Sequence, residues 1–186
     1  MGESPRSPGE PLMNPAVRHA GLIALRLGGL WRGVMIEGAS GAGKSDLALR
    51  AFDLGFRLVA DDRTQVFLSR GRLFGRAPKP LSGLIEARGV GVLRQSHLAF
   101  AQIALIVRCV SGPGEVERLP QVARETILGV ETPMLNLWPL EAAAPTKLWL
   151  ALEHLGELSQ EAYQASRASP VQHPWGGVSG AKGDCR

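Results

Sequence analysis

A glycine-rich stretch, GASGAGKSDLAL, occupies residues 38–49 and strongly limits what the surrounding chain can fold into. It fits the pattern G-x-x-x-x-G-K-S, whose glycines let successive backbone N–H groups turn inward and form an anion-binding nest. An apolar run precedes it, and leucine and alanine follow at helical spacing. A helix that begins at Lys44 adds the positive end of its dipole. The alternative is a flexible turn capped by Ser45, but the strand–loop–helix context favours a phosphate-binding loop.

The residues of this loop predict contacts with a nucleoside triphosphate. Lys44 is expected to face solvent at the start of the helix and to reach the outer phosphates, and Ser45 is expected to bind a magnesium ion. We therefore predict ATP and Mg²⁺ as cofactors. The predicted nucleotide-binding residues are consecutive: Gly38, Ala39, Ser40, Gly41, Ala42, Gly43, Lys44 and Ser45.

The rest of the sequence mixes apolar strand patterns with amphipathic helical ones, which is typical of the α/β class. GLIALRLGGLWRGVMIEG predicts two strands around a glycine turn, TQVFLS and RLFGRA predict a hairpin, and IALIVRCV predicts the most apolar strand. Helical spacing is found in residues 44–55, which Gly55 ends, and again from Lys147 onward. The expected fold is a P-loop nucleotide-binding domain with a mixed β-sheet and flanking helices.

Two carboxylates follow the strand pattern FRLVA, at Asp61 and Asp62. In a right-handed βαβ unit this strand would lie parallel and close to the strand that carries the loop, so both would open onto one crevice. Adjacent strand residues point in opposite directions, so the two aspartates are expected to have different roles. One would act as a base and the other would orient a metal or the loop. The alternative is a turn or a helix cap.

Composition narrows the remaining classes. The 186 residues carry a formal net charge of +4, and 45% are hydrophobic, which fits one globular domain. The sequence contains no basic run with interleaved aromatics, so we expect no nucleic-acid binding. It contains no apolar run that is long enough to cross a membrane. Cys109 and Cys185 are read as free thiols in a reducing, cytoplasmic compartment. Residues 1–16 and 168–186 are predicted to be a disordered leader and tail around a domain at 17–167.

Four stretches together resemble the catalytic domain of HPr kinase/phosphorylase: GASGAGKSD, FRLVADD, LIEARGVGVL and RHAGLIAL. The resemblance extends over about residues 19–152, and the glutamate-arginine-glycine run is more specific than the loop. It implies a fold similar to HPr kinase and PEP carboxykinase. It is closest to the short forms of some proteobacteria, which lack the N-terminal domain of full-length relatives.

The resemblance also implies roles for single residues. Asp61 would be the general base, and the acid in the reverse reaction, with His19 beside it and Lys44 among the catalytic groups. Glu86, which looks buried in the pattern, would be a metal ligand together with Ser45, and Asp62 is assigned to the metal as well. Arg88 and Gly89 complete the family signature. A surface ion pair of Glu86 with Arg88, and a structural histidine at position 19, remain open as alternatives.

One departure from the family limits the expected activity. Relatives place an arginine near the last helix, where PLEAAAPTKLWLALE offers Lys147, which cannot make a bidentate phosphate contact. We therefore expect weak reverse activity and leave a homo-oligomer open. The expected function is an ATP- and Mg²⁺-dependent protein-serine kinase for HPr or an HPr-like phosphocarrier of the phosphotransferase system, regulating carbohydrate and nitrogen metabolism. The alternatives are a kinase of a small metabolite and a non-catalytic nucleotide-sensing module.

Overall fold

The computed structural model describes residues 16–121 and 123–155. The predicted tail and the predicted end of the last helix lie outside these residues. The predicted leader also lies outside them except for its last residue, Ala16, which begins the first strand. The elements follow in chain order: β1 (Ala16–Arg18), β2 (Ala20–Leu27), β3 (Leu30–Glu37), α1 (Lys44–Ala51), η1 (Phe52–Leu54), β4 (Arg57–Ala60), β5 (Thr64–Ser69), β6 (Arg72–Arg76), η2 (Lys79–Leu81), β7 (Leu84–Ala87), β8 (Gly91–Arg94), β9 (Ala101–Cys109), η3 (Pro113–Glu115), β10 (Ala123–Ile127), β11 (Val130–Leu137) and α2 (Ala144–His154).

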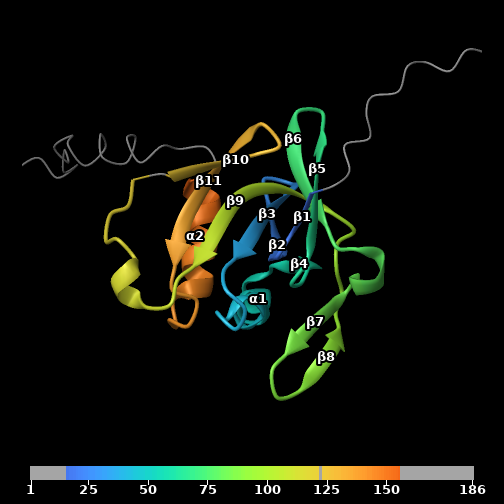
Figure 1. The fold of residues 1–186 in the computed structure, drawn as a ribbon, viewed down its shortest axis with the longest axis horizontal. Helices are drawn as coiled ribbons and strands as arrows, with labels where there is room; N and C mark the ends of the chain where they lie inside the picture. The colour runs from blue at the N-terminus through green and yellow to red at the C-terminus, as the bar shows by residue number, and fades with distance from the viewer. Residues whose placement is uncertain (1–15, 122, 156–186) are drawn as a thin grey trace, which may run out of the picture.

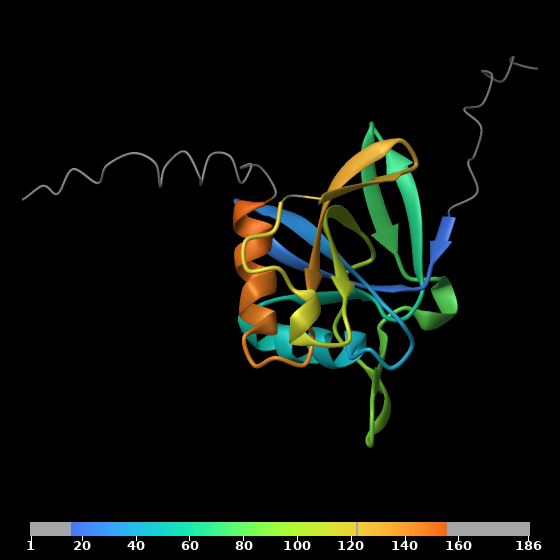
Figure 2. The same cartoon turned by 60° about the vertical axis from the view of Figure 1, so that its left-hand side comes forward.

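The strands form one nine-stranded mixed sheet and a separate two-stranded hairpin, which confirms the expected α/β class with a mixed sheet (Figure 1). The large sheet follows the order β1-β5-β6-β9-β3-β2-β4, with β11 against β9 and β10 beyond it. Strand β9 pairs in parallel with both β3 and β11, whereas the other neighbours are antiparallel. The hairpin β7–β8 extends beyond the body of the sheet (Figure 2).

Two apolar cores lie on the two faces of the sheet. Helices α1 and α2 pack on one face, where Leu47 and Leu148 meet the inward side chains of β3 and β9. On the other face the sheet curls, and side chains of β5 and β6 such as Val66 and Leu73 close over Met35. The alternation along β3 sends Val34 and Ile36 to the first core and Met35 to the second, so this strand is buried on both sides.

Strand β4 lies parallel and close to β3, as expected. One strand, β2, lies between them and pairs antiparallel with both. The cause is the tight hairpin of β2 and β3, whose turn uses Gly28 and Gly29 at φ of 56° and 81°. Two antiparallel steps restore the direction, so β4 still runs parallel to β3 and both end at the same edge of the sheet.

Candidate active site

The loop between β3 and α1 depends on glycine for its shape. Gly38, Gly41 and Gly43 have φ of 150°, 78° and 96°, which other residues rarely adopt. A Cβ on Gly38 would lie 2.8 Å from Cβ of Cys109, and one on Gly43 would lie 3.0 Å from Cδ2 of Leu140. The glycines therefore supply both the turn and the close approach of the loop to β9 and to the segment before α2.

Lys44 closes the loop from within. Its Nζ donates hydrogen bonds to the carbonyl oxygens of Gly38 at 3.0 Å and Ala39 at 2.9 Å, and the residue is only 8% exposed. The expectation that Lys44 faces solvent is therefore wrong, because the loop folds back over the first turn of α1. The ammonium group lies beside backbone that is shaped as an anion nest, where an outer phosphate would be placed.

Asp61 joins the loop to two other parts of the molecule. The hydroxyl of Ser45 donates to its Oδ1 at 2.8 Å, and the backbone N–H of Glu86 donates to its Oδ2 at 3.0 Å. The strand end of β4, the start of α1 and strand β7 thus meet at one half-buried carboxylate. A serine hydroxyl and a carboxylate are hard oxygen donors of the kind that Mg²⁺ accepts alongside phosphate oxygens and water.

Asp62 turns away from the loop. It has a left-handed backbone with φ of 61°, and its Oδ1 lies 3.2 Å from Nδ1 of His19. Both side chains are about half exposed, at 56% and 52%. The contact of His19 is thus with Asp62, whereas the family resemblance implied a place beside Asp61. The two aspartates do have different partners, but the reason is a turn after Ala60, where β4 ends, and not the alternation of a strand.

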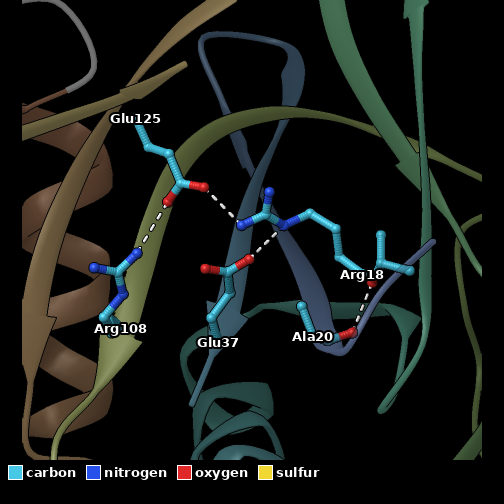
Figure 3. Close-up of polar contacts among 6 residues, drawn as sticks. Arg18, Ala20, Glu37, Arg108 and Glu125 are labelled. Carbon is cyan, nitrogen blue, oxygen red and sulfur yellow. Dashed lines mark hydrogen bonds and ion pairs between the residues drawn. The ribbon is translucent and has the colours of Figure 1, made fainter. Parts of the chain in front are cut away.

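The segment that carries His19 is held by Arg18. Nε of Arg18 lies 2.6 Å from Oε1 of Glu37, and its Nη2 lies 2.6 Å from Oε1 of Glu125 (Figure 3). Arg108 adds a contact of 3.1 Å to the other oxygen of Glu125. Burial lowers the pKa of Arg18, but the hydrogen bonds and charges of Glu37 and Glu125 raise it above its ordinary value.

This network fixes the entrance of the loop, because Glu37 is the last residue of β3 before Gly38. On the other side of His19, the buried hydroxyl of Thr64 donates to the carbonyl oxygen of Ala20 at 2.7 Å. The sequence analysis missed these residues. The only local signal is a glutamate at the end of an apolar strand, while its partners are distant in the chain.

Glu86 and Arg88 lie on the β7–β8 hairpin. The side chain of Glu86 is exposed, so the expectation of a buried glutamate is wrong. Its backbone N–H is the group that donates to Asp61. Within the described residues no ion pair joins Glu86 to Arg88; instead Nη2 of Arg88 lies 3.8 Å from the point that a Cβ on Gly41 would occupy. Across residues 16–121 and 123–155, no group of three or more His, Cys, Asp or Glu side chains is arranged to hold a metal.

Residues 17–143 match the family described as the HPr Serine kinase C-terminal domain. The chain belongs to this family. The chain is 33% identical over 146 residues to the HPr kinase/phosphorylase of Lactobacillus acidophilus. The aligned residues are 73% of this chain and 43% of that protein. It is 36% identical over 117 residues to the HPr kinase/phosphorylase of an Azoarcus species, which covers 56% and 37%.

These curated relatives are longer proteins, and the chain spans less than half their length. Among solved structures, the Hpr(Ser) kinase/phosphatase from Coxiella burnetii superposes with a TM-score of 0.65 at 23% sequence identity. The superposition covers 82% of this chain and 96% of that one, and it shows a common fold. None of the helices in the described part of this HPr kinase domain has the length and apolar character needed to span a bilayer.

One thiol lies against the glycine loop between β3 and α1. Cys109 ends β9, is 8% exposed and touches Gly38. Burial raises the pKa of the thiol to about 11, although the nearby charge of Lys44 lowers it somewhat. The thiol is therefore protonated at neutral pH and serves as a small apolar packing group. Cys109 is a free cysteine, as expected, and Cys185 lies outside the described residues.

Proposed function

We propose that the chain is an ATP- and Mg²⁺-dependent protein-serine kinase that phosphorylates HPr or an HPr-like phosphocarrier of the phosphotransferase system. Membership of the HPr serine kinase family and the names of the relatives support the proposal. The observation that carries it is the junction at Asp61, which is bonded both to Ser45 of the loop and to Glu86 of the hairpin. Such a junction would bring a phosphate nest and a carboxylate for the metal into one site.

The residues present fit the nucleotide and the metal. The nest of Gly38–Gly43, the first turn of α1 and the ammonium of Lys44 would hold the phosphates of ATP. Ser45 and Asp61 supply oxygen atoms for Mg²⁺, which offsets phosphate charge when it is bound. The side chain of Glu86, expected as a metal ligand, remains a candidate because its backbone already contacts Asp61.

We assign the base differently from the family resemblance. Each oxygen of Asp61 accepts one hydrogen bond, from the hydroxyl of Ser45 or from the backbone N–H of Glu86, which ties this carboxylate to the loop and the hairpin. Asp62 has one oxygen near His19 and is more than half exposed, so an incoming serine can reach it. We therefore propose that Asp62 takes the serine proton, that His19 orients Asp62, and that Asp61 positions the metal. The earlier assignment of Asp62 to the metal and Asp61 to the base is reversed.

A transfer assay tests the proposal against its alternatives. The chain is incubated with labelled ATP, Mg²⁺ and HPr, with an HPr variant whose acceptor serine is alanine as the control. Label on HPr that disappears with the variant supports the kinase. Label on a small metabolite would support a metabolite kinase, and tight ATP binding without transfer would support a nucleotide-sensing module.

Weak reverse activity remains a prediction. Nζ of Lys147 lies 2.6 Å from Oε1 of Glu141 on the exposed side of α2, so its charge is engaged away from the loop. We expect phosphorolysis of serine-phosphorylated HPr by inorganic phosphate to be at least about tenfold slower than the forward reaction, because a lone charged hydrogen bond to phosphate is worth about that much. Equal forward and reverse rates, measured under matched substrate concentrations, would contradict it.

A further inference from the structure

The β7–β8 hairpin is fastened at its root to the strand that leads into the site. The backbone N–H of Gln95 donates to the carbonyl oxygen of Gly83 at 2.8 Å, and the N–H of Leu98 donates to that of Leu58 in β4 at 2.8 Å. The hydroxyl of Ser82 and Nε2 of His97 are 2.9 Å apart. The hairpin thus has a defined direction relative to β4 although it projects beyond the sheet (Figure 2).

The side chain of Arg88, in the turn of the hairpin, reaches back to the glycine loop. Strand β7 contacts Asp61 through the N–H of Glu86, and Arg88 follows two residues later at the start of the turn. The turn is closed by a hydrogen bond of 2.9 Å from the N–H of Val90 to the carbonyl oxygen of Ala87. This geometry places Nη2 of Arg88 beside Gly41, 3.8 Å from where a Cβ on that glycine would lie.

The other basic groups that approach the loop are already engaged. Lys44 donates to two loop carbonyls, and Arg50 is bonded to Asp46 and to the carbonyl oxygens of Pro139 and Glu141. Lys147 is paired with Glu141. Arg88 is exposed, and in the part of the chain that the structure describes it makes no hydrogen bond or ion pair. Its five donors are therefore available to a ligand in the loop.

We propose that Arg88 contacts the terminal phosphate of a nucleoside triphosphate in this loop and stabilises the charge of the phosphoryl group in transfer. This rests on the proposed function. In that transfer the bond from the terminal phosphorus to its bridging oxygen breaks, ADP leaves with the electron pair, and a bond to the serine oxygen forms while its proton passes to Asp62. Arg88 forms no covalent bond; its planar guanidinium holds two phosphate oxygens at once.

Nucleotide binding tests the proposal without any phosphocarrier. The affinities of the full chain for ADP and for a non-hydrolysable ATP analogue are measured by calorimetry with Mg²⁺. Arg88→Gln is expected to weaken analogue binding about tenfold or more, the value of a charge-assisted hydrogen bond, and to leave ADP binding unchanged. Arg94→Gln, an equally exposed arginine on β8 of the same hairpin, is the matched control and should change neither affinity.

The outcomes separate the two claims. If the wild-type chain binds neither nucleotide, the proposed function fails and the role of Arg88 fails with it. If the wild type binds both but Arg88→Gln keeps the wild-type affinity for the analogue, the role of Arg88 alone is overturned. A loss of ADP binding equal to that of the analogue would also overturn it, because Arg88 would then act on the whole loop.

A transfer measurement adds a second readout. Arg88→Ala should lower kcat for HPr on the order of a hundredfold with little change in the KM of HPr, since the contact strengthens in the transition state. Guanidinium chloride at millimolar concentration should restore part of this rate, whereas Lys44→Ala should show no such recovery. Rescue of both variants alike, or of neither, would contradict a specific guanidinium contact.

Discussion

The two sides of the site are built differently. On the donor side, Lys44 is buried and Asp61 is held through both oxygens, so the loop and the metal-side carboxylate are arranged before any ligand binds. On the acceptor side, His19 and Asp62 are about half exposed and touch mainly each other. A nucleotide needs a fixed cradle, whereas a protein substrate needs room to approach. Under the proposed function, this difference would make the site preorganised for phosphate and open to a large acceptor.

The largest expected effect is on the donor side. Lys44→Ala should lower phosphoryl transfer by roughly a thousandfold, because the charge beside the outer phosphate is lost. It should also lower the free energy of unfolding by about 1–2 kcal/mol, because the carbonyl oxygens of Gly38 and Ala39 lose their donor. Transfer assays and denaturant unfolding measure the two effects.

A second lysine, Lys147, provides a control for the Lys44→Ala variant. Lys147→Ala removes an exposed pair with Glu141 and should change the free energy of unfolding by less than about 1 kcal/mol, with the forward rate kept. Equal losses of activity in the two variants would mean that the donor side is not specific to the loop.

The close approach of the loop to β9 gives the next effect. Gly38→Ala places a Cβ 2.8 Å from Cβ of Cys109, so loop or strand must shift, and we expect a loss of about 2–4 kcal/mol in the free energy of unfolding together with weaker ATP binding. Gly129→Ala is the control for a left-handed backbone without a close contact, since Gly129 has a positive φ of 81° and no atom within 4 Å of the point that a Cβ would occupy. It should lose about 1 kcal/mol at most and keep ATP binding. Similar losses in both variants would show that backbone strain, and not contact with β9, is the cause.

A smaller effect comes from the thiol beneath the loop. The folded state holds the pKa of Cys109 at about 11, above its ordinary value of 9.0, so folding favours the protonated thiol. This contribution is complete below pH 9 and is lost as pH rises toward 11, because only the unfolded state ionises in that range. The expected loss is about 2–3 kcal/mol.

Comparison with Cys109→Ser isolates this thiol from other groups that titrate at high pH. Unfolding curves are measured for both proteins at pH 8, 9, 10 and 11. The difference in the free energy of unfolding between the wild type and Cys109→Ser should shrink as the pH rises if the neutral thiol stabilises the wild type. A constant difference would show that Cys109 has an ordinary pKa.

The sequence predicted the elements better than it predicted their contacts. The glycine loop, the β2–β3 and β5–β6 hairpins, helix α1 and the apolar strand β9 depend on local patterns, and each is found where it was expected. Strand β4 is parallel and close to β3 as expected, but the place of β2 between them was not predicted, because the order of strands depends on how hairpins pair and local propensity does not determine it. The family of the chain was predicted from motifs and is confirmed by the match over residues 17–143.

Errors in the site have the same origin. Lys44 is buried because the loop folds over α1. The partner of His19 depends on the left-handed backbone at Asp62, which no local sequence pattern predicts. Arg18 and Glu125 are 107 positions apart, and no periodic pattern connects them. The pairs that these residues form therefore required the tertiary structure, and their roles in the site stay predictions.

The central claim is that Asp61 belongs to the donor side and Asp62 to the acceptor side. HPr phosphorylation by Asp61→Asn and Asp62→Asn is measured across a magnesium titration, with ATP affinity recorded in parallel. We predict that Asp62→Asn loses on the order of a hundred- to ten-thousand-fold in rate at every magnesium level while ATP still binds, because the proton acceptor is gone. Asp61→Asn should regain part of its rate as magnesium rises. The opposite pattern, with Asp61→Asn inactive throughout and Asp62→Asn restored by magnesium, would contradict the account.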